Sequence, residues 1–236
     1  MPRDLFLLFY SRFFHMAAPT GKVDKKDSEY DAKHHVRKFE EALSHAWSKL
    51  ADPGAWLSYD EQMVKSTARA NFFIMRYNPK KPIKHGMKGW CICCPSGFCF
   101  VQYIDGGFLG DLQLRGFKDC PLGNTARTAL HVVLDARKTF SDKIVDSGVT
   151  IAMDNYFASA ALLLSLATRD IFTVGTLRSN RVGLDGAMKL WKDKDMKATK
   201  RGEMVMARSP SEIAVITWVD SQVVNLLWSK QIFASD

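Results

Sequence analysis

The chain has 236 residues, of which 47% are hydrophobic, so it is long enough to form one large domain with a substantial core. Its 33 Lys and Arg outnumber 25 Asp and Glu, and the formal charge of +8 favours an anionic partner such as nucleic acid. No apolar run approaches the ~20 residues that cross a bilayer, which argues against an integral membrane protein. Five cysteines, an odd number, argue against a disulfide framework and for a reducing compartment.

The N-terminal part of the chain predicts two helices. Residues 1–16 (MPRDLFLLFYSRFFHM) indicate a short, buried amphipathic helix. A signal peptide is the alternative, but Arg12 interrupts the apolar stretch and no clean cleavage site follows. After a polar linker, apolar positions recur at helical spacing over 34–50, and Asp52-Pro53-Gly54 ends this second helix.

The middle of the chain alternates between strand and helix patterns. The predicted elements are strands at 55–63, 83–94 and 98–104, a helix at 123–140, a strand at 149–153, a helix at 159–169 and a strand at 171–176. Residues 65–81 read as a polar basic loop, and Pro95-Ser96-Gly97 predicts an antiparallel hairpin. Asn124 or Thr125 is expected to cap the first of the two helices. The order β-β-β-α-β-α-β predicts an α/β fold with a mixed sheet, as in a ribonuclease H-like core.

Beyond Arg178 the sequence is basic and interrupted by glycines, without a clear element as far as Arg208. A strand pair at 213–219 and 222–228, with a turn at Asp220-Ser221, follows it. We therefore divide the chain into three parts. These are an N-terminal helical segment (1–54) from a DNA-binding or dimerisation region, a ribonuclease H-like catalytic core (55–180), and a basic, β-rich, insertion-like region (181–236).

Four of the cysteines are clustered at Cys91, Cys93, Cys94 and Cys99. A zinc site is one interpretation, but the cluster lacks the paired CxxC spacing that places ligands tetrahedrally. Small buried thiols in a strand-rich region are the favoured interpretation.

Asp154 stands where a predicted buried strand ends, in the stretch IAMDNYFAS. It could simply cap the following helix, since Asp is a favoured N-cap. In a ribonuclease H-like sheet, however, the first and fourth strands are neighbours, and Asp60 lies on or just past the first. Two carboxylates held close together imply a shared cation or protonation of one of them. Such oxygen ligands suit Mg²⁺, and two ions ~4 Å apart can support phosphoryl transfer on nucleic acid.

Several blocks in this order resemble the transposase domain of the piggyBac superfamily: SYDEQM (58–63), YNPKKPIKHGMKGW (77–90), MDNYFAS (153–159), VGTLRSNRVGL (174–184) and RGEMV (201–205) followed by ITWVD (216–220). The resemblance implies a cut-and-paste DNA transposase with a DDE-type two-metal Mg²⁺ site. Asp60 and Asp154 match the first two catalytic, metal-binding aspartates. It also implies DNA as the partner, a possible homodimer and a nuclear location, with no membrane and no small-molecule substrate.

The third aspartate of the family does not carry over to this sequence. The resemblance places it on a helix after the strand pair at 213–228, and the sequence ends at Asp236 before such a helix. Asp220 reads as a hairpin-turn residue, and a terminal Asp236 is poorly anchored. We therefore expect weak or absent nuclease activity. The alternatives are a domesticated, non-catalytic DNA-binding or scaffold protein and, least favoured, a nuclease that uses Asp60, Asp154 and Asp220.

Basic residues flank the two aspartates in the sequence. The predicted DNA contacts are Lys80, Lys81, Lys84, Lys88, Arg178 and Arg181. The alternative for the lysines is a solvated edge strand. Glu61 should point to the strand face opposite Asp60, so it is not assigned to the metal. Asn155 and Tyr156 could position the metal ligand or contact DNA, but we expect Tyr156 and Phe157 to anchor the strand end in the core.

Overall fold

The computed structural model describes residues 2–12, 26–50, 52–66, 74–107, 110–140, 148–178, 200–209 and 213–229. Its helices are α1 (Arg3–Arg12), α2 (His34–Leu50), α3 (Leu112–Arg115), α4 (Asn124–Thr139) and α6 (Ala160–Ala167). Its strands are β1 (Trp56–Lys65), β2 (Met75–Tyr77), β3 (His85–Cys93), β4 (Cys99–Ile104), β5 (Thr150–Met153), β6 (Phe172–Thr176), β7 (Met204–Arg208), β8 (Ala214–Val219) and β9 (Val223–Trp228). None of the described helices is long and apolar enough to cross a membrane.

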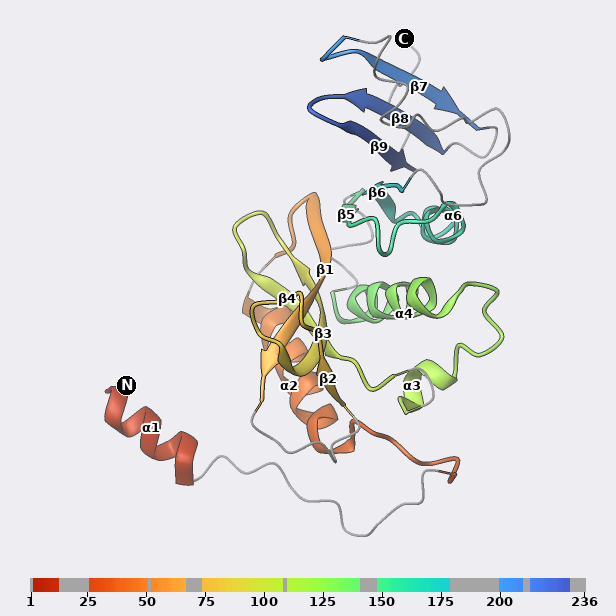
Figure 1. Ribbon diagram of the computed structural model, residues 1–236. Helices are drawn as coiled ribbons and strands as arrows, with labels where there is room; N and C mark the ends of the chain where they lie inside the picture. The colour runs from red at the N-terminus through yellow and green to blue at the C-terminus, as the bar shows by residue number, and fades with distance from the viewer. Residues whose placement is uncertain are drawn as a thin grey trace.

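The described strands form one mixed sheet in the order β2-β3-β1-β5-β6-β9-β8-β7, with β4 also paired to β3 (Figure 1). β5 runs parallel to both β1 and β6, and the other pairs are antiparallel. The stretch β4-β3-β1-β5-β6 reproduces the strand arrangement of a ribonuclease H-like core, so the predicted fold class is confirmed. β9, β8 and β7 then extend the same sheet beyond β6.

The hairpin predicted at Pro95-Ser96-Gly97 is present between β3 and β4. The amide of Gly97 donates a hydrogen bond to the carbonyl of Cys94 at 2.9 Å. The amide of Cys94 donates to the carbonyl of Phe98 at 3.0 Å. Gly97 has φ +86°, a left-handed conformation that a glycine adopts without steric cost. The hairpin therefore has the local turn chemistry that its sequence indicates.

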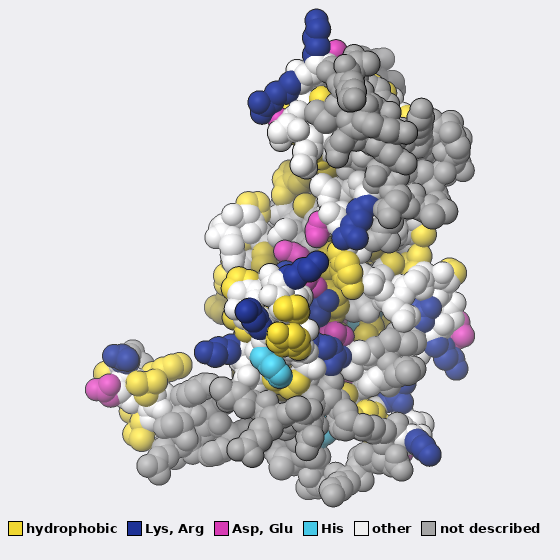
Figure 2. Space-filling model, viewed as in Figure 1, with side chains coloured by type: hydrophobic (Ala, Val, Ile, Leu, Met, Phe, Trp, Pro, Cys, Tyr) yellow, Lys and Arg dark blue, Asp and Glu magenta, His cyan; other side chains and the backbone are white. Residues whose placement is uncertain are grey.

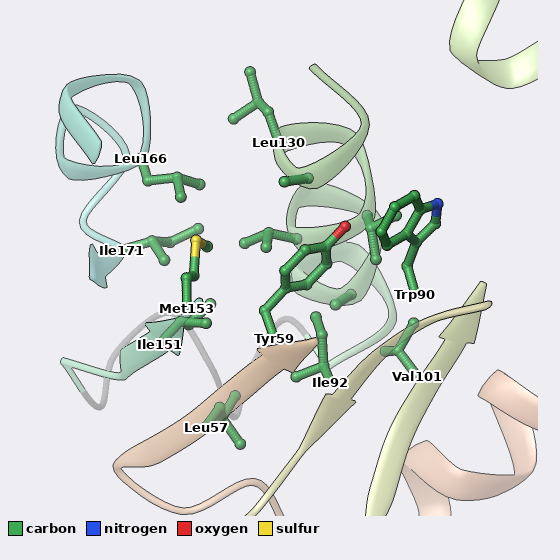
Figure 3. Close-up of a cluster of buried hydrophobic side chains, with 14 of the residues drawn as sticks. Leu57, Tyr59, Trp90, Ile92, Val101, Leu130, Ile151, Met153, Leu166 and Ile171 are labelled. Atoms are coloured by element: carbon green, nitrogen blue, oxygen red, sulfur yellow. The ribbon is translucent and has the colours of Figure 1, made fainter. Parts of the chain in front are cut away.

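The main core lies between the central strands and helices α4 and α6, which cover one face of the sheet (Figure 1). Figure 3 shows the side chains that fill it: Leu57, Tyr59, Trp90, Ile92, Val101, Leu130, Ile151, Met153, Leu166 and Ile171. Three of the four residues of β5 are buried, as expected for a parallel strand between two neighbours, and this explains why its sequence is mostly apolar. Helix α2 lies against β4, and α1 stands apart from the body of the molecule.

Three described elements were not predicted. β2 lies within the predicted loop 65–81, α3 follows β4, and β7 lies in the stretch that showed no clear pattern. β2 and α3 span only three and four residues, too few for a periodic pattern to emerge. β7 is the outer strand of the sheet, and four of its five residues are exposed, so it shows no alternation of buried and exposed positions.

The expected burial of the first helix is wrong, and so is the cap expected for the helix at 123–140. Leu5 and Phe6 in α1 are 43% and 52% exposed. Helix α4 begins after Gly123, which forms no side-chain cap hydrogen bond, and neither Asn124 nor Thr125 is its N-cap. The N-cap of α6 is Ser159, whose hydroxyl accepts from the Leu162 amide at 3.3 Å. Asp154 is therefore not the cap of that helix.

A buried ionic cluster joins the N-terminal segment to the core. The ammonium of Lys33, whose side chain is fully buried, lies 2.8 Å from Glu40 Oε2 and 3.5 Å from Asp111 Oδ2. Asp111, also fully buried, accepts a hydrogen bond from the Tyr103 hydroxyl and pairs with Arg37 at 3.0 Å. Burial acts against ionisation of Asp111, but the surrounding ammonium, phenol and guanidinium groups outweigh it and lower the pKa of its carboxyl group.

Replacing Asp111 with alanine should destabilise the fold by about 3–5 kcal/mol, because it leaves buried cations without their shared carboxylate. Urea denaturation measures this change. The pKa of Asp111 in the folded protein is lowered from 3.8. The difference in stability between the parent and the variant should therefore be largest at pH 7, and it should shrink as the pH falls below 3.8 towards the folded pKa. The exposed Asp119 is a control, and its alanine variant should stay within about 0.5 kcal/mol of the parent. Equal stabilities of the two variants at pH 7 would contradict the role given to the cluster.

Candidate metal and DNA site

The two candidate catalytic aspartates lie on neighbouring strands, Asp60 within β1 and Asp154 directly after the last residue of β5. β1 and β5 are parallel, and the last residue pair in their register is Tyr59 with Met153. One step further along each chain are Asp60 and Asp154, both exposed. Facing residues on paired strands lie about 4.8 Å apart, so the register brings these two positions together at the edge of the sheet.

Both aspartates have the same local hydrogen bond. Asp60 Oδ1 accepts from the amide of Glu61 at 2.7 Å, and Asp154 Oδ1 accepts from the amide of Asn155 at 2.5 Å. Within the described part of the chain neither carboxylate takes part in an ion pair. The backbone thus orients one oxygen of each carboxylate.

A tight turn follows Asp154 and is anchored by Phe157. The carbonyl of Asp154 accepts from the amides of Phe157 and Ala158 at 3.0 and 3.1 Å. The Phe157 ring is buried and meets Tyr59 edge-on at 4.8 Å and Trp90 edge-on at 5.3 Å, measured between centroids. Because Tyr59 precedes Asp60 on β1, this aromatic contact couples the two aspartate-bearing segments directly. The expected anchoring role of Phe157 is thus seen in the structure.

Gly175 allows the turn to approach β6 closely. It pairs with Met153 in the register, and a Cβ atom at this position would lie 2.6 Å from the Cβ of Ala158. Any larger residue would have to push the turn away from the sheet. The glycine therefore helps to fix where Asp154 stands.

Glu61 and its lysine partners lie on the other face of β1. Each carboxylate oxygen of Glu61 pairs with one lysine, Oε1 with Lys81 at 3.2 Å and Oε2 with Lys88 at 2.6 Å. Burial acts against ionisation of Glu61, but the two ammonium groups outweigh it and lower its pKa below the ordinary 4.5. Lys81 and Lys88 are therefore partly neutralised, and a DNA phosphate would have to compete with Glu61 for them.

The other predicted DNA contacts differ in their surroundings. Lys80 and Lys84 are exposed, and Arg178 is exposed after β6 with its Nε donating to Asn155 Oδ1 at 2.8 Å. Arg178 thus stands beside the residue that follows Asp154, as expected for parallel β5 and β6. Arg181 lies outside the described residues.

The surface around this site carries mixed charge. Figure 2 shows Lys and Arg side chains interspersed with acidic and hydrophobic ones over the middle of the molecule, rather than a patch of one sign. Pairing across strands explains this pattern, which the residue order alone could not reveal. The hydrogen bond from Arg178 to Asn155 and the double pairing of Glu61 depend on such contacts, and sequence reasoning missed both.

A third metal ligand is not found next to the two aspartates in the described residues. No group of three or more His, Cys, Asp or Glu side chains in this part of the chain could hold a metal ion. Asp220 lies at the β8–β9 turn, where it pairs with Arg201 at 2.6 Å. β8 is three strands away from β5 in the sheet, or roughly 14 Å, so Asp220 does not join Asp60 and Asp154.

The cysteines are free thiols with no disulfide among them. Cys91 is buried, and the other four are half-buried. Cys93 pairs with Cys99 across β3 and β4, and burial, together with the neighbouring thiol, raises the pKa of Cys93 to about 12. This thiol is therefore protonated at neutral pH.

A cavity of about 390 Å³ lies elsewhere, between α2, β4 and α4. Its lining includes both basic and acidic side chains, among them Arg37, Glu41, Asp135 and Lys138. Neither Asp60 nor Asp154 contributes to it. It is a feature separate from the aspartate pair.

The pKa of Glu61 should lie below 4.5 in a carboxyl-detected NMR titration, and Lys88→Met should raise it, because the closer ammonium group is removed. Lys84→Met removes an exposed charge from the same segment and should leave the Glu61 pKa unchanged. A Glu61 pKa at or above 4.5 in the parent protein would rule out the ion pairs.

Gly175→Ala should destabilise the protein by about 1–3 kcal/mol, since the added methyl group collides with Ala158. Chemical denaturation would measure the loss. Gly54→Ala is the matched control, because a Cβ atom there meets nothing within 4 Å. A Gly175 variant as stable as the control would show that the turn can move away at no cost.

Comparison with known proteins agrees with this geometry. The chain matches the family model described as Transposase IS4 over residues 7–233. Among curated proteins none matches significantly. It is similar in fold to the piggyBac transposase in a cryo-EM synaptic complex with hairpin DNA, with a TM-score of 0.65 and 23% identity over 88% of this chain and 40% of that one. The match covers less than half the length of that transposase. Because the family model matches nearly the whole chain, the chain belongs to the Transposase IS4 family.

Proposed function

We propose that this chain is the core of a DNA transposase in which Asp60 and Asp154 hold a divalent metal ion beside a DNA phosphate. The observation that carries the proposal is the parallel register of β1 and β5, which brings the two exposed aspartates to neighbouring positions. Carboxylates held close together repel each other when both are charged, and a cation between them would remove that repulsion.

The donor set fits Mg²⁺. This ion prefers hard oxygen ligands, and one or two carboxylates commonly hold it while water and phosphate oxygens complete its shell. When bound, such an ion polarises a phosphoryl oxygen and stabilises the attacking and leaving oxygens of a displacement. The protein's own part is to fix both carboxylates, through the backbone hydrogen bonds at Glu61 and Asn155 and the buried Phe157 ring.

DNA is the proposed partner. The similar piggyBac transposase was determined in a complex with hairpin DNA, and the net charge of +8 suits a polyanion. Arg178, beside the turn that carries Asp154, is well placed to bind a phosphate through its planar guanidinium group. The exposed Lys80 and Lys84 would add contacts that depend on salt rather than on sequence. A homodimer and a nuclear location stay predictions.

Catalysis requires more than these two ligands. A second candidate function is DNA binding without strand cleavage, as expected from the sequence, in which the third aspartate of the family has no match. In that case the aspartates would still bind metal, but they would not activate a phosphate for displacement. The two candidates therefore differ in chemistry and share the DNA-binding surface.

Metal binding and nicking can be tested separately. Titration with Mn²⁺, followed by electron paramagnetic resonance, should show a bound ion that is lost in Asp60→Asn and in Asp154→Asn, because each amide removes one charged ligand. A Mg²⁺-dependent plasmid-nicking assay then distinguishes a transposase core, whose activity disappears in Asp154→Asn, from a protein that binds DNA without cutting it.

Asp119→Asn removes an exposed carboxylate far along the chain from both positions and should leave metal binding unchanged. If the Asp60 and Asp154 variants bind Mn²⁺ as tightly as the parent chain, the metal site lies elsewhere and the proposal is wrong.

A further inference from the structure

Tyr156 stands out because it belongs to the turn that carries Asp154 but does not join the core. It is two residues after Asp154, and it is 42% exposed, whereas its neighbour Phe157 is 2% exposed. The two residues were expected to anchor the strand end together, and for Tyr156 this is wrong. Its ring therefore has a surface that is accessible to a ligand.

The surroundings hold the ring of Tyr156 in place. It meets Phe157 edge-on with centroids 5.1 Å apart, and the ammonium of Lys88 lies over it at 5.2 Å. Lys88 is itself fixed, since its ammonium lies 4.0 Å from the Trp90 ring and pairs with Glu61. A ring supported in this way loses little conformational freedom when it binds a ligand, which favours affinity.

The chemistry next to the ring is that of a phosphate site. Asp154 precedes it by two residues, a span of at most about 7 Å along the chain. Asn155 stands between Asp154 and Tyr156 in the sequence, and its side chain accepts a hydrogen bond from the guanidinium group of Arg178. An anion bound by Arg178 or by the proposed metal would therefore bring the rest of its nucleotide near the Tyr156 ring.

We propose that Tyr156 stacks on an unpaired DNA base beside the phosphate that approaches Asp60 and Asp154. The proposal rests on the proposed function and adds a base-binding position to that site. An aromatic side chain can stack on a base only where the face of that base is accessible, as it is in single strands and not within a duplex. Every base has such a face, so the contact carries little sequence preference.

The test compares single-stranded oligonucleotides with duplexes of the same sequence in fluorescence anisotropy. Tyr156→Ala should bind the single strand about tenfold more weakly, with duplex binding nearly unchanged. Tyr156→Phe keeps the ring and should bind like the parent. Tyr77→Ala removes another exposed tyrosine, 66% exposed on β2, and should have no effect.

A second readout reports stacking directly. A 2-aminopurine base in the single strand should be quenched by the parent protein and by Tyr156→Phe, but not by Tyr156→Ala. Replacing that base with an abasic site should weaken binding to the parent and leave the alanine variant unaffected. Circular dichroism confirms that the variants are folded.

The outcomes separate this proposal from the function on which it rests. If Mn²⁺ and duplex DNA bind as expected but Tyr156→Ala matches the parent on single strands, the base contact is wrong and the proposed function stands. The same conclusion follows if Tyr156→Phe behaves like the alanine variant. If the chain binds neither metal nor DNA, both proposals fall.

Discussion

The parallel pairing of β1 with β5 is the contact on which the proposed site depends. These strands are separated by some ninety residues of chain, and no local interaction could hold their ends together. Their register does so, and Phe157 secures it by packing against Tyr59 and Trp90. Burial of these aromatic rings stabilises the core and, by the same contacts, sets the relation of Asp60 to Asp154. Stability and the candidate site share one set of interactions.

Much of this arrangement could be predicted from the sequence. The buried β5 appears as a continuous apolar run, helices α2 and α4 show helical spacing, and the hairpin after β3 has its turn residues. The order of these elements then suggests which strands are neighbours. Asp154 could be singled out because it follows a buried strand, and Asp60 because that topology places its strand next to β5. These elements are predictable because their local sequence pattern and the overall topology agree.

What the sequence could not show are contacts across strands. Whether Lys88 faces solvent or Glu61 depends on which residues of β1 and β3 stand opposite each other, and a shift of one residue would reverse the answer. The same holds for Tyr156 and Phe157, adjacent aromatic residues that the backbone turn sends to opposite environments. β7 was not predicted because it is an outer strand without a buried face, so its sequence does not alternate between apolar and polar residues.

The enclosure of Lys33 has a chemical consequence. Lysine side chains usually react readily with acylating reagents, because the amine is at the surface and can lose its proton. Here the amine is sealed under Glu40 and Tyr103 at the junction of the N-terminal segment and the core. A reagent could reach this amine only after the N-terminal segment has moved away from the core. The rate of modification at this single amine, followed by mass spectrometry, would therefore measure how often the two parts of the protein separate.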